Sequence, residues 1–381
     1  MNYKFKSTIL KIKDLFKSNK SIQLHFPKFS GNEKKYLNEC IDTSFVSSAG
    51  EFVNLFEDKV RTYVKAKKAV AFVNGTSAIQ TGLKVVGVKS NHEVITQALT
   101  FVATANAIKY NNANPIFLDV DLDTMGLSPK SVENFLNQHG ELREEGCYNK
   151  ISGKKISACL PMHTFGFPMR IRDLIIICNK WKIPVVEDAT ESFGSLYKGK
   201  STGSFGRVGI FSFNGNKIIT SGGGGVLITD ENLLANDAKH ISTTAKVPHE
   251  YEYYHDKVGF NYRMPNINAA LACAQIEQIH DIIKSKRKLA KEYSNFFKKE
   301  GIKFRTELKK TKANYWLMCL EFGNDKDRNL FLAETNKCNI MTRPIWKLMF
   351  DLPMYKNCQK DSQKNARFLE KRIVNIPSGI I

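Results

Sequence analysis

Two charged side chains lie in apolar surroundings, where a charged group is unfavourable unless it has a partner or a catalytic role. Lys217 follows the apolar segment 210–213 closely and precedes four consecutive glycines, Gly222 to Gly225. Asp188 ends the run Ile183-Pro184-Val185-Val186-Glu187, which has the composition of a buried strand. A lone lysine is usually a solvated surface charge, whereas a partly desolvated amine is a nucleophile that attacks carbonyl carbons. The pair therefore predicts covalent chemistry at Lys217, supported by the carboxylate of Asp188.

Pyridoxal phosphate (PLP) requires these two residue types from a protein. A lysine bonds covalently to the cofactor, and an aspartate keeps the ring nitrogen protonated so that the ring accepts electrons from the substrate. The sequence therefore predicts that Lys217 is the catalytic residue and that Asp188 binds the cofactor ring.

The phosphate of PLP needs a site of its own. Gly75-Thr76-Ser77 lies where a predicted strand gives way to a helix, and a helix N-terminus with a glycine and hydroxyls binds anions. Taken alone, the segment is equally typical of a glycine turn with Thr76 or Ser77 as the helix cap. Beside Asp188 and Lys217 it predicts a phosphate cradle, to which Ser212, five residues before Lys217, adds a hydroxyl donor.

Two further side chains are weaker candidates for the cofactor site. Phe101 begins a predicted helix just after a strand, where an aromatic ring can stack on the cofactor, although a core phenylalanine is the commoner role. His163 stands at the end of a predicted strand. A histidine there is more often structural than catalytic, and we retain it as a secondary candidate.

The elements that position these residues follow from an alternation of short β-branched runs with helical stretches. This pattern predicts an α/β fold with a mixed, mostly parallel sheet, in which ligands bind at the carboxyl ends of the strands. The predicted strands are 69–73, 93–96, 115–120, 156–162, 184–187 and 226–229, and the predicted helices are 76–86, 100–110 and 171–180. The charge-rich segment 138–155 is expected to be an exposed loop insertion.

We divide the chain into three parts: a basic amphipathic extension over 1–20, a large cofactor-binding domain over 21–265, and a small C-terminal α+β domain over 266–381. The last is predicted to contain a long helix at 267–297, a strand at 315–320 and a helix at 328–336. In the extension, the apolar residues Phe5, Ile9, Ile12 and Phe16 recur at helical spacing. We expect this helix to pack on the body, with peripheral contact with an acidic membrane surface as the alternative.

Composition excludes several classes of function. The formal net charge of +20 suggests nucleic acid, but the lysines are spread along the chain without a recognisable binding module, so no nucleic-acid partner is expected. No apolar run reaches the length of a membrane span, and the amino terminus lacks the apolar core of a signal peptide. The eight cysteines are scattered without a Cys-x-x-Cys pair. This predicts free thiols in a cytoplasmic protein and no metal site.

Taken together, the segments resemble the DegT-type nucleotide-sugar aminotransferases, PLP enzymes with the aspartate-aminotransferase fold (PLP fold type I). The resemblance runs from about residue 22 to the end of the chain. Its landmarks are Gly31-Asn32-Glu33, Val46-Ser47-Ser48, Val73-Asn74-Gly75-Thr76, Ala98-Leu99-Thr100-Phe101, Glu187-Asp188-Ala189, Lys217 with its glycines, Gly259-Phe260-Asn261-Tyr262-Arg263 and Thr342-Arg343-Pro344. Each block is modest alone, but their order and spacing are specific.

The resemblance implies a function. The segment Phe213-Asn214-Gly215-Asn216-Lys217 and the glycines after it are most similar to enzymes that aminate C4 of UDP-4-keto-6-deoxy-N-acetylhexosamines, with glutamate as the amino donor. In such enzymes the asparagine matching Asn261 reaches the cofactor phosphate of the neighbouring subunit, which implies a homodimer with shared active sites. The substrate diphosphate would suit Arg263 or Arg343. A GDP- or dTDP-linked keto sugar is the alternative substrate.

Some positions differ from the family's usual pattern. Thr190 stands where relatives commonly have alanine beneath the cofactor ring, and Glu191 occupies a position held by glutamine, histidine or glutamate that contacts the ring hydroxyl.

Two other functions remain to be weighed. PLP-dependent sugar dehydratases replace the lysine by histidine, and Lys217 argues against that class. A non-catalytic regulatory member would be favoured if the lysine, the aspartate or the phosphate cradle were broken, and all three are intact.

Overall fold

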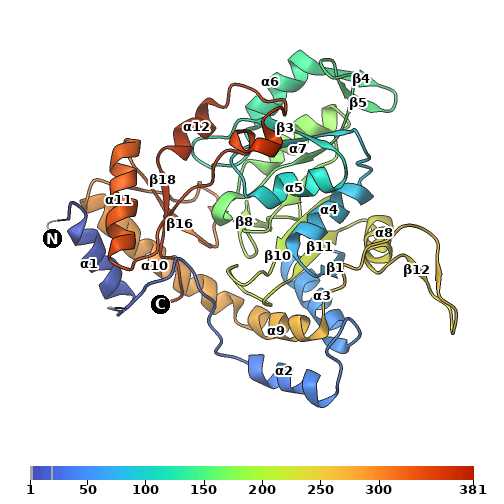
Figure 1. Ribbon diagram of the computed structural model, residues 1–381, viewed down its shortest axis with the longest axis horizontal. Coiled ribbons are helices and arrows are strands. Elements are labelled where there is room, and N and C mark those ends of the chain that lie inside the picture. The colour runs from blue at the N-terminus through green and yellow to red at the C-terminus, as the bar shows by residue number, and fades with distance from the viewer. Residues whose placement is uncertain (1–2, 19) are drawn as a thin grey trace.

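The computed structural model describes residues 3–18 and 20–381, and a mixed sheet forms its centre (Figure 1). The strands in spatial order are β1 (Lys68–Phe72), β11 (Gly225–Thr229), β10 (Val208–Ser212), β7 (Val186–Asp188), β6 (Lys155–Leu160), β2 (Glu93–Gln97) and β3 (Asn114–Leu118). The pairs from β10 to β3 are parallel, and β11 is antiparallel to both of its neighbours. The predicted mixed, mostly parallel sheet is therefore confirmed.

The joint between β7 and β6 brings Asp188 into the middle of the sheet. Two parallel bridges, Cys159 with Val185 and Met162 with Asp188, connect these strands. Asp188 thus lies at the carboxyl end of a central strand, the position at which parallel α/β sheets bind ligands.

The segment 138–155 is not the loop insertion that its charge suggested. It forms a hairpin of β4 (Gly140–Arg143) and β5 (Gly146–Asn149), and β5 pairs with the start of β6. Cys147 and Asn149 are buried, and Asn149 donates to Glu93. The charged residues lie on the exposed side and at the tip of the hairpin, while its other side is buried. The high charge content therefore led to the wrong prediction of a loop.

Helices pack against this sheet and cover the cores that it forms. Helix α4 contacts β10 and β11, and α3 contacts β1. The helices of this part are α2 (Glu33–Asp42), α3 (Glu51–Val64), α4 (Gly75–Val85), α5 (Val102–Tyr110), α6 (Pro129–His139), α7 (Ile171–Lys180), α8 (Asn232–Ser242) and α9 (Asn266–Glu277), with a 3₁₀ turn η1 (Thr164–Gly166). The helix predicted over 267–297 is in fact two, α9 and α10 (Ile279–Lys299), which meet at Gln278.

A second, smaller sheet lies beside the first. Its order is β14 (Lys303–Phe304), β16 (Met318–Glu321), β18 (Ile373–Ile376) and β17 (Arg343–Pro344), all antiparallel. The helices of this part are α10, α11 (Asp325–Lys337) and α12 (Lys364–Glu370), with the 3₁₀ turns η2 (Met349–Asp351) and η3 (Pro353–Tyr355). A three-stranded sheet of β15 (Thr311–Lys312), β8 (Leu196–Tyr197) and β9 (Lys200–Ser201) links the two parts. Because α9 packs on α2 and α3, the domain boundary at residue 265 stays a prediction.

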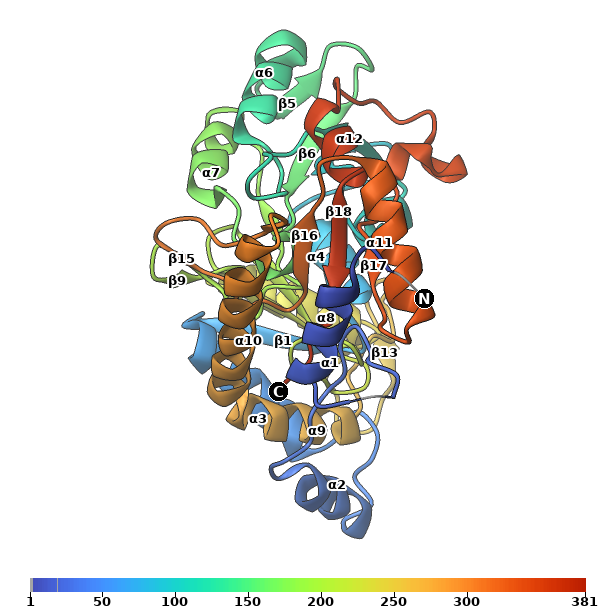
Figure 2. The ribbon, with the colours of Figure 1, turned by 90° about the vertical axis from the view of Figure 1, so that its left-hand side faces the viewer.

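The amino-terminal helix α1 (Lys6–Leu15) lies against this smaller part, near α11 (Figures 1 and 2). Phe5, Ile9 and Ile12 are buried, and the Phe5 ring packs edge-on against Phe322 and Phe331. Glu334 accepts hydrogen bonds from the backbone N–H groups of Lys4 and Phe5. The apolar face of the helix is therefore used within the chain, and its lysine-rich face is left to the surface.

The hairpin of β12 (Lys246–Val247) and β13 (Tyr254–His255) projects from the body (Figure 1). Tyr251, Tyr253 and Val258 on this arm are each more than three-quarters exposed.

In the part of the chain that the structure describes, no helix combines the length and the apolar character that crossing a membrane requires. All eight cysteines lie in that part and are free thiols.

Candidate active site

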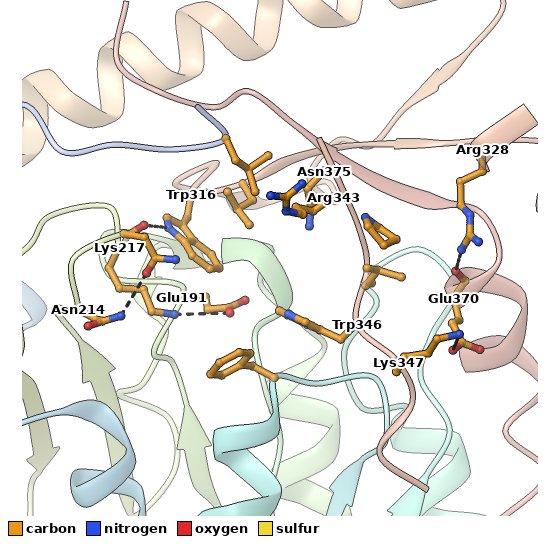
Figure 3. Close-up of a pocket in the computed structure, with 16 residues that line it drawn as sticks. Glu191, Asn214, Lys217, Trp316, Arg328, Arg343, Trp346, Lys347, Glu370 and Asn375 are labelled. Carbon is orange, nitrogen blue, oxygen red and sulfur yellow. Dashed lines mark hydrogen bonds and ion pairs between the residues drawn. The ribbon is translucent and has the colours of Figure 1, made fainter. Parts of the chain in front are cut away.

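Lys217 lies on the loop between β10 and β11, and its side chain enters a cavity of about 490 Å³. Only 12% of that side chain is exposed. Its amine lies 3.6 Å from Oε1 of Glu191 and 4.1 Å from the ring centroid of Trp316 (Figure 3). The amine is thus held between a carboxyl group and an aromatic face, and it points into a space large enough for a ligand.

Glu191 is buried, and its second oxygen accepts a hydrogen bond of 2.8 Å from the backbone N–H of Phe165. Burial raises the pKa of this carboxyl to about 7, against the opposing effect of the charge on Lys217. A carboxyl group that titrates near neutrality beside an amine can hold or release a proton there.

The carboxylate of Asp188 is oriented by two hydroxyls. Thr104 donates to Oδ2 at 2.7 Å, and Thr190 donates to Oδ1 at 2.7 Å through its hydroxyl and at 3.2 Å through its backbone N–H. Asp188 is 1% exposed, so the carboxylate is desolvated and fixed. Thr190 therefore has a defined hydrogen-bond partner in this chain.

The start of α4 forms a compact group with Ser212. Asn74 caps the helix by accepting a hydrogen bond of 2.8 Å from the N–H of Ser77, so the hydroxyls of Thr76 and Ser77 are not needed as caps. A Cβ added at Gly75 would come within 2.9 Å of the Cβ of Ser212. The missing side chain at Gly75 therefore lets Ser212 approach the helix N-terminus, as a phosphate cradle shared by both segments requires.

The other predicted residues lie in different places. Phe101 lines the cavity, half exposed, with its ring 6.3 Å from that of Trp346. His163 is buried, and both of its nitrogens are used internally: Nε2 lies 2.9 Å from Glu187, and Nδ1 accepts from the N–H of Met169. Asn261 is exposed and accepts a hydrogen bond from Arg263. It does not line the cavity of its own chain.

Most of the remaining cavity wall was not identified from the sequence. It is made by residues of the C-terminal part: Trp316, Arg328, Arg343, Trp346, Lys347, Glu370 and Asn375 (Figure 3). Of these, only Arg343 was a candidate. The one sequence signal for the tryptophans is that two of the chain's three lie in the last 66 residues, each within a short apolar run.

These residues fit PLP. The cofactor needs an amine for its carbonyl carbon, an anion beside its ring nitrogen and donors for its phosphate. Lys217, Asp188 and the group formed by Gly75, Thr76 and Ser212 supply those chemical types. A Cβ at Gly75 would fill the space between the start of α4 and Ser212.

Comparison with known sequences identifies the family. The profile of the DegT/DnrJ/EryC1/StrS aminotransferase family matches residues 27–380. The chain belongs to this family. As a DegT-family member it is a PLP-dependent sugar aminotransferase, and PLP is its cofactor.

Two curated relatives of this DegT-family enzyme match it along almost its whole length. The putative pyridoxal phosphate-dependent aminotransferase EpsN of Bacillus subtilis is 34% identical, over 95% of this chain and 92% of its own. The GDP-perosamine synthase of Escherichia coli is also 34% identical, over 94% of this chain and 93% of its own.

Solved structures share the fold. Helicobacter pylori PseC, an aminotransferase involved in the biosynthesis of pseudoaminic acid, superposes with a TM-score of 0.85 at 21% identity, covering 94% of both chains. The aminotransferase TlmJ from Streptoalloteichus hindustanus also gives a TM-score of 0.85, at 19% identity over 94% of this chain and 93% of its own. The predicted aminotransferase fold is confirmed.

Proposed function

We propose that the enzyme transfers the amino group of glutamate to C4 of a UDP-linked 4-keto-6-deoxy-N-acetylhexosamine, for the synthesis of bacterial surface amino sugars. The observation that carries the proposal is the placing of the Lys217 amine in a cavity whose remaining walls are basic and aromatic. A diphosphate needs cations, a sugar ring packs well on an indole, and a transaminase needs the lysine.

Each residue has a defined part in this proposal. When bound, PLP supplies an electron-accepting ring that stabilises negative charge on the reacting carbon. Lys217 would hold the cofactor and move the proton at its Nζ atom. Asp188, fixed by Thr104 and Thr190, would keep the ring nitrogen protonated. Gly75, Thr76, Ser77 and Ser212 would hold the phosphate at the positive end of α4.

The cations that line the cavity differ in how completely their charge is paired with other side chains. Arg328 donates to the backbone oxygen of Glu370, and Lys347 lies 3.8 Å from a carboxylate oxygen of the same residue. Arg343 is exposed and donates to Asn336 and to the Thr342 carbonyl rather than to a carboxylate. Arg328 and Arg343 therefore both lack a carboxylate partner, and the greater exposure of Arg343 makes it the preferred contact for the substrate diphosphate.

The proposal includes a homodimer. Asn261 is exposed and lies next in sequence to the projecting arm, on which Tyr251, Tyr253 and Val258 are open to solvent. Large apolar side chains on a projecting hairpin favour a protein partner, and a second copy would let Asn261 reach the neighbouring cofactor site. Sedimentation at micromolar concentration tests this part: a monomer that is fully active would contradict it.

A GDP-linked 4-keto-6-deoxyhexose is the second candidate substrate. It is favoured by the two relatives from Escherichia coli and Vibrio cholerae, at 34% and 32% identity, that are GDP-perosamine synthases. The two candidates differ in the nucleobase and in the group at C2 of the sugar, so they are separated by direct assay.

The test is turnover of purified holoenzyme with glutamate and a panel of UDP-, GDP- and dTDP-linked 4-keto-6-deoxy sugars. Amino-sugar nucleotides are detected by mass spectrometry. We expect the UDP-N-acetyl substrate to give the highest kcat/KM. Preference for the GDP sugar would establish the second candidate, and no turnover of any keto sugar would overturn the proposed function.

A further inference from the structure

Trp316 contacts the lysine segment in two ways. The centroid of its ring lies 4.1 Å from the Nζ atom of Lys217, and its indole Nε1 donates a hydrogen bond of 2.6 Å to the carbonyl oxygen of Asn216 (Figure 3). Trp316 is 4% exposed, so most of its ring is packed within the protein, and both contacts lie at the cavity wall. One side chain thus holds the amine and also the backbone immediately before it.

Asn314, two residues earlier, connects the same segment to Glu191. Its Oδ1 accepts from the backbone N–H of Trp316 at 2.8 Å, and its Nδ2 donates to the carbonyl oxygens of Glu191 and Phe193, both at 3.0 Å. The segment 314–316 therefore fixes both loops that flank the reactive amine: the loop of Glu191 on one side and the loop of Lys217 on the other.

The backbone of this segment is unusual. Tyr315, between Asn314 and Trp316, has a φ of +52°, in the left-handed region that bulky residues rarely adopt. Its ring packs edge-on against Phe167, with centroids 5.5 Å apart. A bulky residue keeps this conformation only where the surrounding structure holds it, here through the contacts of Asn314 and Phe167.

We propose that Trp316 is a positioning residue for Lys217. This inference rests on the proposed function, in which Lys217 is the lysine that holds the cofactor. A lysine that bonds reversibly to a cofactor is a free amine for part of each turnover. In this structure that free amine lies on the Trp316 ring, while the indole N–H fixes the loop that carries it. Trp316 therefore keeps the amine within reach of the reacting carbon.

Two substitutions separate the two contacts. Trp316→Phe keeps an aromatic face for the amine and removes the hydrogen bond to Asn216. Trp316→Leu removes both. Trp181→Phe is the matched control, because Trp181 lies at the end of α7, outside the cavity. For each purified holoenzyme, the rate of the first half-reaction with glutamate is followed from the visible absorbance of the bound cofactor.

We expect Trp316→Phe to slow the half-reaction about fivefold, as loss of one hydrogen bond implies, and Trp316→Leu about 50-fold, with the ring face also lost. The KM for glutamate and the amount of bound cofactor should stay within about twofold of wild type, since neither contact involves the donor. Trp181→Phe should react at the wild-type rate. A general loss of structure would instead lower rate, affinity and cofactor content together.

A second readout does not depend on activity. In protein freed of cofactor, the rate at which acetic anhydride modifies Lys217 is measured by peptide mass spectrometry. Loss of the ring should expose the amine, so we expect Trp316→Leu to be labelled at Lys217 several times faster than wild type. Lys198, whose amine lies over Tyr197 instead, provides the internal reference and should be labelled equally in both proteins.

The outcomes are distinct. A Trp316→Leu enzyme with the wild-type half-reaction rate, or with unchanged labelling of Lys217, would overturn the proposal. Loss of cofactor from Trp316→Phe would also overturn it, because Trp316 would then serve cofactor binding or folding and not the position of the amine. Failure of the proposed function is seen separately, as activity that survives Lys217→Ala.

Discussion

The amine of Lys217 lies 3.6 Å from Oε1 of Glu191, a buried carboxyl group whose pKa is raised to about 7. Desolvation is the main cause of the shift, and the charge on the lysine opposes it. The site therefore pairs the amine that we propose as the nucleophile with a group that changes charge near neutral pH, a combination typical of active sites.

The raised pKa of Glu191 predicts a pH dependence of stability. Between about pH 4.5 and 7, the folded protein keeps this carboxyl protonated whereas the unfolded chain ionises it, so the free energy of unfolding falls as pH rises through that window. The slope from this one group is at most about 1.4 kcal/mol per pH unit. Urea unfolding of cofactor-free wild type and Glu191→Gln at pH 5, 6 and 7 measures it. Parallel pH curves for the two proteins would contradict the assignment.

Lys286 predicts the opposite slope at higher pH. It is completely buried and donates to the carbonyl oxygen of Ser378, and burial lowers the pKa of its amine to about 7. From about pH 7 to 10 the unfolded chain binds the extra proton, so the free energy of unfolding rises with pH.

In Lys286→Met that rise should be smaller by up to about 1.4 kcal/mol per pH unit, as judged by urea unfolding. The neighbouring His25 does not interfere, because burial and then the charge on Lys286 hold the pKa of that imidazole well below its usual value. An unchanged slope in the variant would show that Lys286 is not the titrating group.

Gly75→Ala tests the close approach of Ser212 to α4. The new Cβ would lie 2.9 Å from the Cβ of Ser212, so one of the two segments must move. We expect the affinity for PLP to fall at least about tenfold, since a displaced donor weakens charge-assisted hydrogen bonds to phosphate. Titration of cofactor-free protein by absorbance measures the change. Gly323→Ala, where the new Cβ meets nothing within 4 Å, should bind PLP as wild type does.

Asp188→Asn tests the role of the buried carboxylate. The variant should fold, because the hydroxyls of Thr104 and Thr190 can still pair with an amide. Its kcat should fall by about 100-fold or more, since a neutral amide does not hold a protonated ring nitrogen. Thr190→Ala removes one hydrogen bond to the carboxylate and leaves Thr104, so a loss of about fivefold is expected. A larger effect of Thr190→Ala than of Asp188→Asn would contradict this order.

The sequence predicted the half of the site that depends on short-range patterns. Asp188 ends a strand, Gly75 begins a helix and Lys217 lies on the loop after β10, and the alternation of elements predicts that such positions meet at one edge of a sheet. The alternative interpretation of this segment, with Thr76 or Ser77 as the helix cap, is wrong, because Asn74 caps α4. With the cap at Asn74, the hydroxyls of Thr76 and Ser77 are not used as the helix cap.

The other half depends on contacts between distant segments, which periodicity does not encode. Trp316 reaches Asn216 across 100 residues, and Asn314 reaches Glu191 across 123. The sequence predicts a strand over 315–320, but Tyr315 is left-handed and the strand begins at Met318. Tertiary contacts with Glu191 and Phe193 determine that conformation, so the strand that local propensity predicts at 315–317 does not form.

The assignment of Lys217 is tested most directly by identifying the lysine that bonds to PLP. Purified holoenzyme is reduced with borohydride, which makes the bond to the cofactor permanent, and the modified peptide is sequenced by mass spectrometry. We expect a pyridoxyl group on Lys217 of the wild-type enzyme and none on Lys217→Ala. A pyridoxyl group on another lysine of the wild-type enzyme, or covalent cofactor retained by Lys217→Ala, would contradict it.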